Sequence, residues 1–368
     1  MHSNACKLGC IASPQPFAFC IHRFARNLTA MSGKPVTSYD VAKAAGVSQS
    51  AVSRCFTPGA SVSKATRAKI MKAVDRLGYR PNAIARSLIT QRSNMVAIIV
   101  ANIGYHPELT AALSRCFTER GLHILLFTIE HERDADRIVD QIWQYRVDGV
   151  IAAVHLPRRH VESFARRRMP LVFINRLYAD VPSNSVCCDQ VEGERTLVDR
   201  LLATGHTRFG IVSGPADSLV SNQRVEEARG RLEAAGIGTV AIVEGAFDYA
   251  SGREAVRTLA AQLGAAPDAV ICANDMMAIG CMDGARYDLG LRVPEDVSVV
   301  GFDGLGPAAW ASYDLVTIRQ PLDAMVDAAA DMLLARVENP ALGAERRMFS
   351  GELVEGGSVR SSPRCAPA

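Results

Sequence analysis

From Met95 onward, short apolar runs alternate with longer segments whose apolar residues recur at helical spacing. Each short run holds four to six residues between turn residues, the pattern of a strand buried on both faces of a sheet. Strands joined by helices form parallel sheets, and these strands are too many for one modest sheet. The predicted strands are Val96–Ala101, His123–Thr128, Gly149–Val154, Leu171–Asn175, Phe209–Ser213, Val240–Val243, Ala269–Cys272 and Val297–Gly301.

The segments between these strands carry apolar residues on one helical face and charged residues on the other. Helices in these places would cover the sheets, so we expect two α/β lobes. Ligands of such sheets bind at the carboxyl ends of the strands, and two facing lobes would form a cleft there. The predicted helices lie near Glu108–Arg120, Asp134–Tyr145, Val161–Arg168, Val191–Thr204, Leu219–Ala235, Ser251–Leu263 and Met276–Leu289.

Ahead of the sheets, residues 36–54 have the pattern of two short helices separated by one glycine. Thr37 and Asp40 form a capping-box pair for the first helix. Gly46 supplies a left-handed turn, and Ser48 can cap the second helix. This is the helix-turn-helix layout, in which the second helix lies in a DNA major groove. An ordinary helical hairpin in a core would share the same pattern.

A third helix is predicted from Lys64 to Leu77, between Ser63 as its N-cap and Gly78 as its end. A shorter helical segment follows at Asn82–Thr90, and helices of this length need a partner to be stable. That partner could be the same segment of a second copy, or DNA. The inner face of the third helix is predicted to consist of Ala65, Ala68, Ile70, Ala73, Val74 and Leu77.

The charge of the chain is divided sharply between its two parts. Residues 32–93 contain eleven Lys or Arg and two acidic residues, whereas residues 94–368 contain 27 Arg, no Lys and 36 acidic residues. A basic module joined to an acidic body indicates that only the first part meets a polyanion such as DNA.

Composition excludes several other classes of protein. The ten cysteines lack metal-ligand spacing and a disulfide framework, so we expect no metal, no cofactor and a reducing cytoplasmic location. No apolar run is long enough for a transmembrane helix. Pro14 and Pro16 interrupt the only candidate export signal, within Leu8–Ile21. Residues 1–31 are expected to be a disordered leader or a segment ahead of the true start at Met31.

Candidate chemistry lies at the ends of the predicted strands. No catalytic motif stands at a strand-to-helix turn, so nothing indicates an enzyme. Asn274 and Asp275 follow one strand and Asp303 follows another, where carboxylates could accept hydrogen bonds from ligand hydroxyls. Arg224 and Phe247 could reach the same cleft. The alternatives are helix N-caps for the aspartates, a surface residue for Arg224 and a core aromatic for Phe247.

These residues lie among motifs that resemble the LacI/GalR family of bacterial transcriptional regulators. The resemblance runs from Val36 to Gly357 in the family's order. The matching motifs are VTSYDVAKAAGVS, VSR, VSKATRAKI, LGYRPNAIARSL, VSGP, ANDMMAIG, GLRVPEDVSVVGFDG and TIRQP.

The resemblance implies an all-α helix-turn-helix headpiece, a hinge helix and an α/β body of two parallel-sheet lobes like periplasmic sugar-binding proteins. It implies a homodimer on a palindromic operator in double-stranded DNA, controlled by a small molecule bound between the lobes. The residue types of the candidates themselves, two aspartates, an asparagine, an arginine and a phenylalanine, suit a sugar or sugar derivative, and Arg224 leaves room for a sugar acid. The implied DNA-binding residues are Thr37, Ser48, Gln49, Ser50, Ser53, Arg54, Asn82, Ala85 and Leu88. The implied effector-binding residues are Asp189, Arg224, Phe247, Asn274, Asp275 and Asp303.

The chain departs from the family pattern at several positions. Gln49 stands where many relatives have Tyr or another large residue, and Ala51 stands where they have Thr. The loop Cys55–Gly59 replaces a Val-Leu-Asn-Gly run, and His106–Leu109 replaces a motif with two aromatics. The operator sequence and the effector therefore cannot be taken from relatives. The tail lacks leucine heptads, so a dimer is expected rather than a tetramer.

The leading hypothesis is thus a sequence-specific DNA-binding regulator, expected to act as a repressor, that responds to a ligand in the interlobe cleft. We expect a DNA-binding domain at 32–80, a hinge at 81–93 and an effector-binding and dimerisation domain at 94–368. Its first lobe would comprise 94–189 and 321–349, and its second lobe 190–320 and 350–360. A solute-binding protein for a transporter would share these lobes but would need an export signal and would have no use for the basic module.

Overall fold

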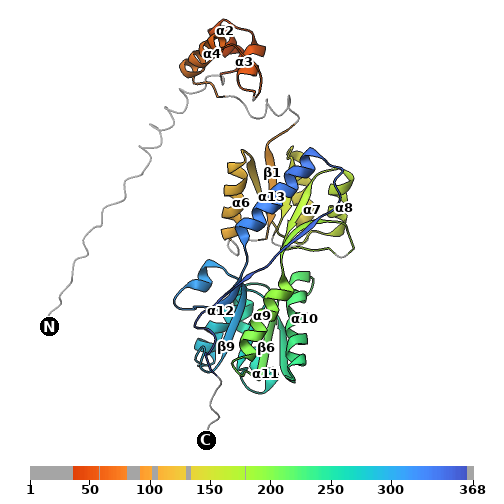
Figure 1. The fold of residues 1–368 in the computed structure, drawn as a ribbon, viewed down its shortest axis with the longest axis vertical. Helices are drawn as coiled ribbons and strands as arrows, with labels where there is room; N and C mark the ends of the chain where they lie inside the picture. Colours follow the sequence, from red (N-terminus) through yellow and green to blue (C-terminus); the bar gives the residue numbers. More distant parts are fainter. Residues whose placement is uncertain are drawn as a thin grey trace, which may run out of the picture. The chain divides into compact units, whose positions relative to one another are not determined.

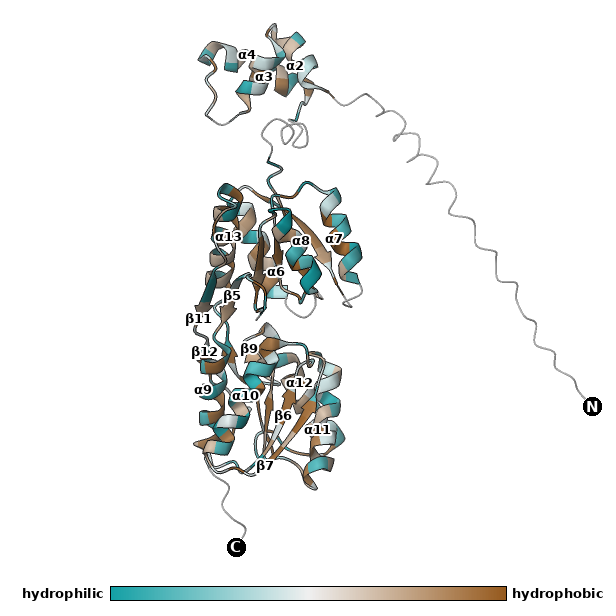
Figure 2. Cartoon of the chain, turned by 90° about the vertical axis from the view of Figure 1, so that its right-hand side faces the viewer, coloured by the Kyte–Doolittle hydropathy of each residue, from teal (hydrophilic) through white to brown (hydrophobic). Residues whose placement is uncertain are grey.

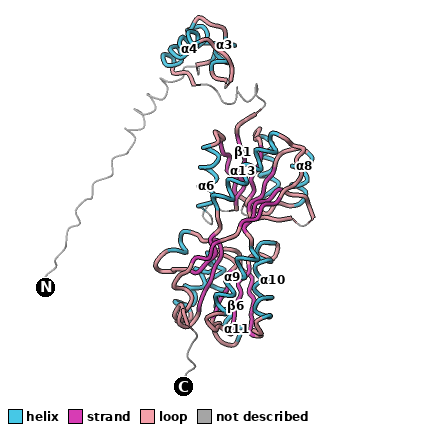
Figure 3. The backbone as a smooth tube through the Cα atoms, viewed as in Figure 1, coloured by secondary structure: helices cyan, strands magenta, loops and turns pink. Residues whose placement is uncertain are grey.

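The computed structural model describes residues 36–57, 59–80, 92–101, 107–129, 134–178 and 180–362. The chain divides into two compact units, Met1–Arg86 and Ser87–Ala368 (Figure 1). Within the described residues, the first unit contains only helices, and the second contains two sheets with helices packed on both faces (Figure 3). The two-part fold class expected from the sequence is confirmed.

The described residues of the first unit form a three-helix cluster around a small apolar core. Its helices are α2 (Ser38–Ala45), α3 (Gln49–Cys55) and α4 (Lys64–Leu77). Val41, Val52 and Ile70, one from each helix, are almost completely buried. Helix α4 begins and ends where the sequence predicted, with Ser63 as its N-cap.

The predicted inner face of α4 was wrong in its first turns. Ala65 and Ala68 are exposed, whereas Ile70, Ala73 and Val74 are buried. The first turn of α4 therefore extends beyond the helices it packs against, and only its later turns reach the core. Alanine fits either environment, so the sequence alone could not distinguish the two cases.

The body consists of two lobes, each built on a six-stranded sheet. The first-lobe sheet has the order β11-β5-β4-β3-β1-β2 and is parallel throughout. The second-lobe sheet has the order β12-β10-β9-β8-β6-β7 and is parallel except for β12. The first-lobe strands are β1 (Met95–Val100), β2 (His123–Thr128), β3 (Gly149–Ala152), β4 (Leu171–Ile174), β5 (Asn184–Cys188) and β11 (Arg346–Phe349). The second-lobe strands are β6 (Arg208–Ser213), β7 (Thr239–Glu244), β8 (Ala269–Cys272), β9 (Ser298–Asp303), β10 (Val316–Arg319) and β12 (Glu352–Val354).

Helices cover both faces of each sheet because successive strand residues point to opposite sides. Ile98 of β1 packs in a core with the helices α6 and α13, and its neighbour Ile99 packs with α7 and α8. In the second lobe α9 and α10 cover one face, and α11 and α12 cover the other. Figure 2 shows the hydrophobic residues concentrated in the strands between these layers. The helices are α6 (Pro107–Glu119), α7 (Ala135–Gln144), α8 (Arg158–Arg166), α9 (Gln190–Leu202), α10 (Leu219–Ala234), α11 (Tyr249–Leu263), α12 (Asp275–Asp283) and α13 (Leu322–Glu338).

The chain passes between the lobes three times. It leaves the first lobe after β5, returns after β10 into α13, and crosses again between β11 and β12. Three adjacent backbone connections restrain the lobes to hinge-like or twisting movements about one side.

Several elements of this body were not among those predicted. Helix α13 and the strands β5, β10, β11 and β12 are additional. Helix α8 begins at Arg158 and ends at Arg166, three residues before the predicted start and two before the predicted end. Helix α12 stops at Asp283 and continues as a π-helical turn, Gly284–Asp288.

Helices α11 and α12 cross at two glycines that permit a close approach. A Cβ atom on Gly252 would overlap the carbonyl oxygen of Met277, and one on Gly280 would overlap that of Tyr249. Because the obstructing atoms belong to the backbone, neither site can relax by moving a side chain.

Gly280→Ala should therefore destabilise the second lobe by several kcal/mol, whereas Gly230→Ala should be neutral or slightly stabilising. Gly230 lies within α10 and has open space where a Cβ would be. Urea unfolding of both variants measures the difference. Equal midpoints would contradict the close-packed crossing.

Candidate functional site

The helix-turn-helix of the first unit is fixed by its caps. The Thr37 side chain accepts a hydrogen bond from the Asp40 amide. In return, the Asp40 carboxylate accepts a hydrogen bond from the Thr37 amide at 2.9 Å. Gly46 is left-handed with φ 63°, and the Ser48 hydroxyl accepts from the Ala51 amide. These local features were predicted from the sequence and are confirmed.

Helix α3 presents a polar face opposite its buried residues. Val52 and Cys55 point into the core, whereas Ser50 and Arg54 are exposed one turn apart on the same face. The Arg54 Nε donates to the Ser50 carbonyl at 3.4 Å, and no carboxylate among the described residues pairs with Arg54. Its guanidinium is available to an acceptor outside the chain.

The other DNA-binding candidates occupy different environments. Gln49 and Ser53 are half-buried, and the Gln49 amide donates to the Ser38 hydroxyl at 3.3 Å. Thr37 and Ser48 are exposed, but both hydroxyls serve as caps. The remaining candidates lie outside the described residues: Asn82, Ala85 and Leu88.

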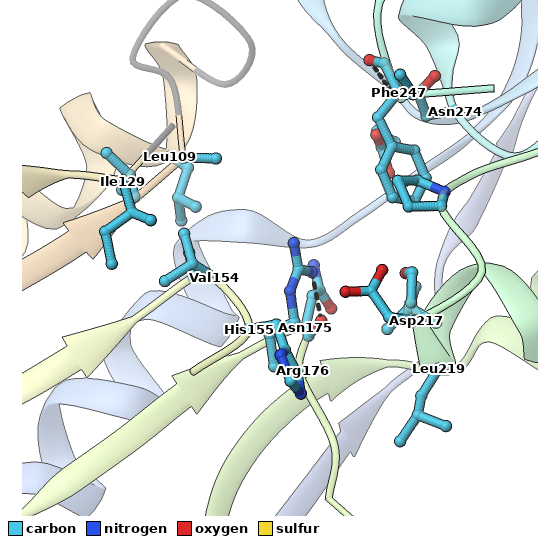
Figure 4. Close-up of a pocket in the computed structure, with 18 of the residues that line it drawn as sticks. Leu109, Ile129, Val154, His155, Asn175, Arg176, Asp217, Leu219, Phe247 and Asn274 are labelled. Carbon is cyan, nitrogen blue, oxygen red and sulfur yellow. Dashed lines mark hydrogen bonds between the residues drawn. The ribbon is translucent and has the colours of Figure 1, made fainter. Parts of the chain in front are cut away.

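A cavity of about 550 Å³ lies between the lobes, within the range of small-molecule sites. In Figure 4 the labelled first-lobe residues face the labelled second-lobe residues across this space. From the first lobe the lining includes Leu109, Ile129, Val154, His155, Asn175 and Arg176. From the second lobe it includes Asp217, Leu219, Arg224, Phe247, Asn274 and Asp303, and Gln320 comes from the second crossover.

A chain of hydrogen bonds joins the two lobes at the base of this cavity. The Asn175 amide donates to the Gln320 Oε1 at 2.6 Å, and the Gln320 Nε2 donates to the Asp303 Oδ1 at 2.6 Å. The same carboxylate oxygen lies 3.4 Å from the Arg224 Nη2. We call these four residues the interlobe relay.

Arg224 is held rigidly by the second lobe. Its Nε donates to the Gln190 side chain at 2.7 Å, and its Nη1 donates to the Ala273 carbonyl. Its guanidinium carbon lies 3.6 Å from the centre of the Phe302 ring. The side chain is only 4% exposed, so its charge is balanced by Asp303 and by these fixed dipoles rather than by water.

Phe247 and Asn274 form one wall of the cavity. Phe247 has a φ of 62°, and its ring lies against Gly214, where a Cβ would overlap it. The Asn274 amide donates to the Phe247 carbonyl at 2.9 Å, and its oxygen accepts from the Met277 amide as the N-cap of α12. Asn274 thus caps a helix and lines the cavity at the same time.

Asp275 and Asp189 are placed differently from the other effector-binding candidates, because neither lines the cavity. Asp275 is completely buried and accepts from the Thr317 hydroxyl at 2.6 Å and the Leu305 amide at 2.7 Å. Burial, followed by the nearby Asp303 charge, raises the pKa of Asp275 to about 7. Asp189 is the N-cap of α9, bonded to the Glu192 amide. The N-cap alternative raised for Asp275 and Asp303 describes neither, because Asn274 caps α12 and Asp303 ends β9. Asp275 instead supports the loop behind the cavity.

Several cavity residues were not among the candidates. Asn175 and Arg176 follow β4, and His155 follows β3, so the strand-end rule could have found all three. Burial lowers the pKa of Arg176, and its Nη1 donates to the Asn175 carbonyl at 2.7 Å. Gln320 lies on a crossover, and although the TIRQP motif contains it, it was not singled out as a site residue.

The departure at the start of α6 creates a second contact between the lobes. The sequence resemblance implied an aromatic residue at the position of Glu108, whose Oε1 accepts a hydrogen bond from the Gly306 amide at 3.1 Å. Gly306 begins the turn that follows β9 in the second lobe. A polar interlobe bond thus replaces an aromatic wall.

Glu194 lies behind the cavity without a hydrogen-bond partner among the described residues. It is 1% exposed, and neither carboxyl oxygen is satisfied there. Burial raises the pKa of Glu194 to about 8, although Arg224 opposes the increase. Its carboxyl group is therefore largely protonated at neutral pH.

When folding raises the pKa of an acid, the folded protein holds the proton more tightly than the unfolded protein. The resulting stability is complete below the pKa of the unfolded state and is lost as the pH rises through the pKa of the folded state. For Glu194 that window runs from about 4.5 to about 8. Across this window the wild type should lose a few kcal/mol of unfolding free energy, because each pKa unit corresponds to about 1.4 kcal/mol. Glu194→Gln should not show this loss. Thermal unfolding at pH 5 and pH 8 tests this, with the exposed Glu233→Gln as control. Identical pH dependence in wild type and Glu194→Gln would contradict it.

Two family models match this chain. The model for bacterial regulatory proteins of the lacI family matches residues 37–82, and the model for a periplasmic binding protein-like domain matches residues 198–359. Among the described residues, no helix is long and apolar enough to cross a membrane.

Curated proteins and solved structures agree with these matches. The ribose operon repressor of Escherichia coli (strain K12) is 31% identical over 331 residues, covering 88% of this chain and 99% of that protein. The HTH-type transcriptional regulator CelR of Thermobifida fusca is 33% identical over 316 residues, covering 81% of this chain and 90% of that protein. The lac repressor dimer bound to operator and the anti-inducer ONPF superposes with a TM-score of 0.79 at 27% identity, covering 88% of this chain and 99% of that chain. A CelR–cellobiose complex superposes with a TM-score of 0.66 at 28% identity, covering 88% of this chain and 99% of that chain.

The resemblance seen in the sequence is thereby confirmed, and the relatives are transcriptional regulators rather than enzymes. The chain belongs to the lacI family of bacterial regulatory proteins and is a DNA-binding transcriptional regulator.

Proposed function

We propose that this regulator binds a palindromic operator as a homodimer and that a sugar or sugar derivative in the interlobe cavity changes its affinity for that operator. The observation that carries the proposal is the interlobe relay, which lines the cavity with residues from both lobes and from a crossover. A ligand that replaces these hydrogen bonds alters the preferred arrangement of the lobes.

The chemistry of the cavity supports a polyhydroxylated ligand. Asp303, Asn175 and Gln320 offer acceptors and donors that can pair with hydroxyl groups, and they come from different elements. Phe247 and Leu109 supply apolar surface for the carbon face of a sugar ring. Arg176, rather than Arg224, could pair with the carboxylate of a sugar acid, because the Arg224 guanidinium is already paired with Asp303. Of the relatives, one is named as a ribose operon repressor, and another was solved with cellobiose.

Helix α3 and its caps support the DNA-binding half of the proposal. In a dimer, two such helices would enter successive major grooves about 34 Å apart. We assign Gln49, Ser50 and Arg54 to base contacts. The other polar candidates of the first unit would contact the DNA backbone and position the protein on the duplex. Leu88 would wedge into the minor groove between two paired hinge segments. The superposed lac repressor dimer is bound to an operator, which is consistent with this arrangement.

The proposed domains are the DNA-binding domain 32–80, the hinge 81–93 and the effector-binding and dimerisation domain 94–368. The chain would act on DNA in the cytoplasm, and no catalytic role is proposed for any of its residues. Ligand binding in the cleft would rotate the first lobes of the dimer and change whether the two hinges can pair.

Arg54→Ala should reduce discrimination between a selected operator and a scrambled duplex by about tenfold or more, because a bidentate base contact contributes about 1–3 kcal/mol. Lys69→Ala, on the exposed face of α4, should leave that ratio unchanged. Fluorescence anisotropy with both duplexes measures the ratio. An unchanged ratio for Arg54→Ala would remove Arg54 from the base-reading residues.

Asp303→Asn should abolish the thermal stabilisation produced by the effector while leaving operator affinity within about twofold. Asparagine keeps the acceptor for Gln320 and tolerates the φ of 128° at this position, but it loses the charge. The effector is first found by a thermal-shift screen of sugars, sugar acids and nucleosides. Asp140→Asn, on the exposed face of α7, is the control. Full retention of ligand binding in Asp303→Asn would contradict the site.

A further inference from the structure

Four arginines form an exposed cationic surface on an otherwise acidic body. They are Arg146 after α7 and Arg166, Arg167 and Arg168 at the end of α8, and all four are exposed. The body they belong to contains 27 Arg against 36 acidic residues from 94 to 368. We call this set the arginine edge, and neither the cavity nor helix α3 includes any of it.

The arginine edge lies where the first-lobe strands begin. Arg146 precedes the start of β3 by three residues, and Arg168 precedes the start of β4 by three. Strand β3 lies between β1 and β4 in the sheet, so the start of β4 is about 10 Å from the start of β1. The arginines therefore lie around the point where the chain enters the body at Met95.

That point is fixed by the Asp148 carboxylate, which binds the incoming chain. Asp148 accepts hydrogen bonds from the Ser93 amide, the Ser93 hydroxyl and the Asn94 amide, at 2.8–2.9 Å. The chain that comes from the DNA-binding unit thus joins the body at the arginine edge. Only twelve peptide links, from Arg80 to Arg92, connect the described part of that unit to the described part of the body.

The helices that carry the edge are packed together. The Trp143 ring of α7 lies 4.8 Å from the Phe164 ring of α8, and the Arg167 guanidinium stacks on Trp143 at 4.3 Å. Figures 1 and 2 show α7 and α8 side by side on one face of the first-lobe sheet. The four charges are consequently presented together.

Internal ion pairs do not account for these charges. Within the described chain, the only carboxylate paired with the edge is Glu162, which lies 3.9 Å from Arg166. Cations near helix C-termini are favoured by the helix dipole, and this would explain one arginine on each helix. The helix dipole does not explain why Arg166, Arg167 and Arg168 follow one another with Arg146 close by. Such a surface attracts polyanions.

We propose that the arginine edge binds the phosphate backbone of DNA that flanks the operator. This proposal rests on the proposed operator binding, which supplies the duplex close to the edge. Duplex DNA presents one negative charge about every 1.7 Å, and arginine pairs with phosphate in a bidentate geometry. The contact adds affinity without reading sequence, so operators with longer flanks are bound more tightly.

The test compares two duplexes that carry the same site, selected by the full chain from a random pool. One ends at the site, and the other extends about 15 base pairs beyond it on each side, roughly one and a half helical turns. The variant is Arg146→Gln/Arg166→Gln/Arg168→Gln, which leaves Arg167 on Trp143. The control, Arg137→Gln/Arg229→Gln/Arg292→Gln, removes the same charge from exposed positions elsewhere in the body. Affinities are measured over a range of salt concentrations.

On the extended duplex the edge variant should bind at least about tenfold more weakly at low salt than wild type. The slope of log K against log[salt] should be smaller by about 0.9 for each phosphate that the variant no longer neutralises. On the short duplex the variant should match wild type, and the control should match wild type on both. An edge variant equal to wild type on both duplexes would overturn the inference and favour an acidic protein as the partner of this surface. Equal losses on both duplexes would also overturn it. If wild type selects no site at all, the proposed operator binding fails instead.

Discussion

The buried ion pair between Arg224 and Asp303 is the interaction at which the cavity lining and the hydrogen bonds between the lobes meet. A charged pair in the interior is stable only when its remaining hydrogen-bonding groups are satisfied. Gln190, Ala273 and the Phe302 ring satisfy the arginine, and Gln320 satisfies the aspartate. Gln320, which bonds to Asp303, also accepts a hydrogen bond from Asn175 of the first lobe, so the ion pair is connected to both lobes. The relative position of the lobes is thus coupled to the charges that line the cavity.

This coupling explains how a ligand can act at a distance. A sugar hydroxyl that bonds to Asp303 competes with Gln320, so occupancy of the cavity and the relay cannot be independent. Three crossovers restrict the lobes to movement about one side, and the chain to the DNA-binding unit joins the first lobe at the far end of its strands. Any rotation of the first lobe is passed to that junction through a rigid, doubly covered sheet.

The sequence predicted local features better than those set by tertiary contacts. The caps at Thr37 and Ser48 depend on residues within one turn, so spacing was sufficient to identify them. The strands β11 and β12 are short, half-exposed and rich in charge, and their places at the sheet edges depend on partners far away in the chain. Asp275 and Asn274 are adjacent in sequence, yet only Asn274 lines the cavity. Glu194 had no sequence signature, because its burial follows from how α9 packs.

The central claim is that the cavity and the operator are energetically linked through the interlobe relay. Binding free energies must be coupled reciprocally, so the direct measurement is the ligand dissociation constant of the dimer, free and saturated with operator. Saturation with operator should change this constant by about five- to 150-fold, and the ligand should change operator affinity by the same factor. A ligand that binds the cavity with the same dissociation constant in both states would contradict the account.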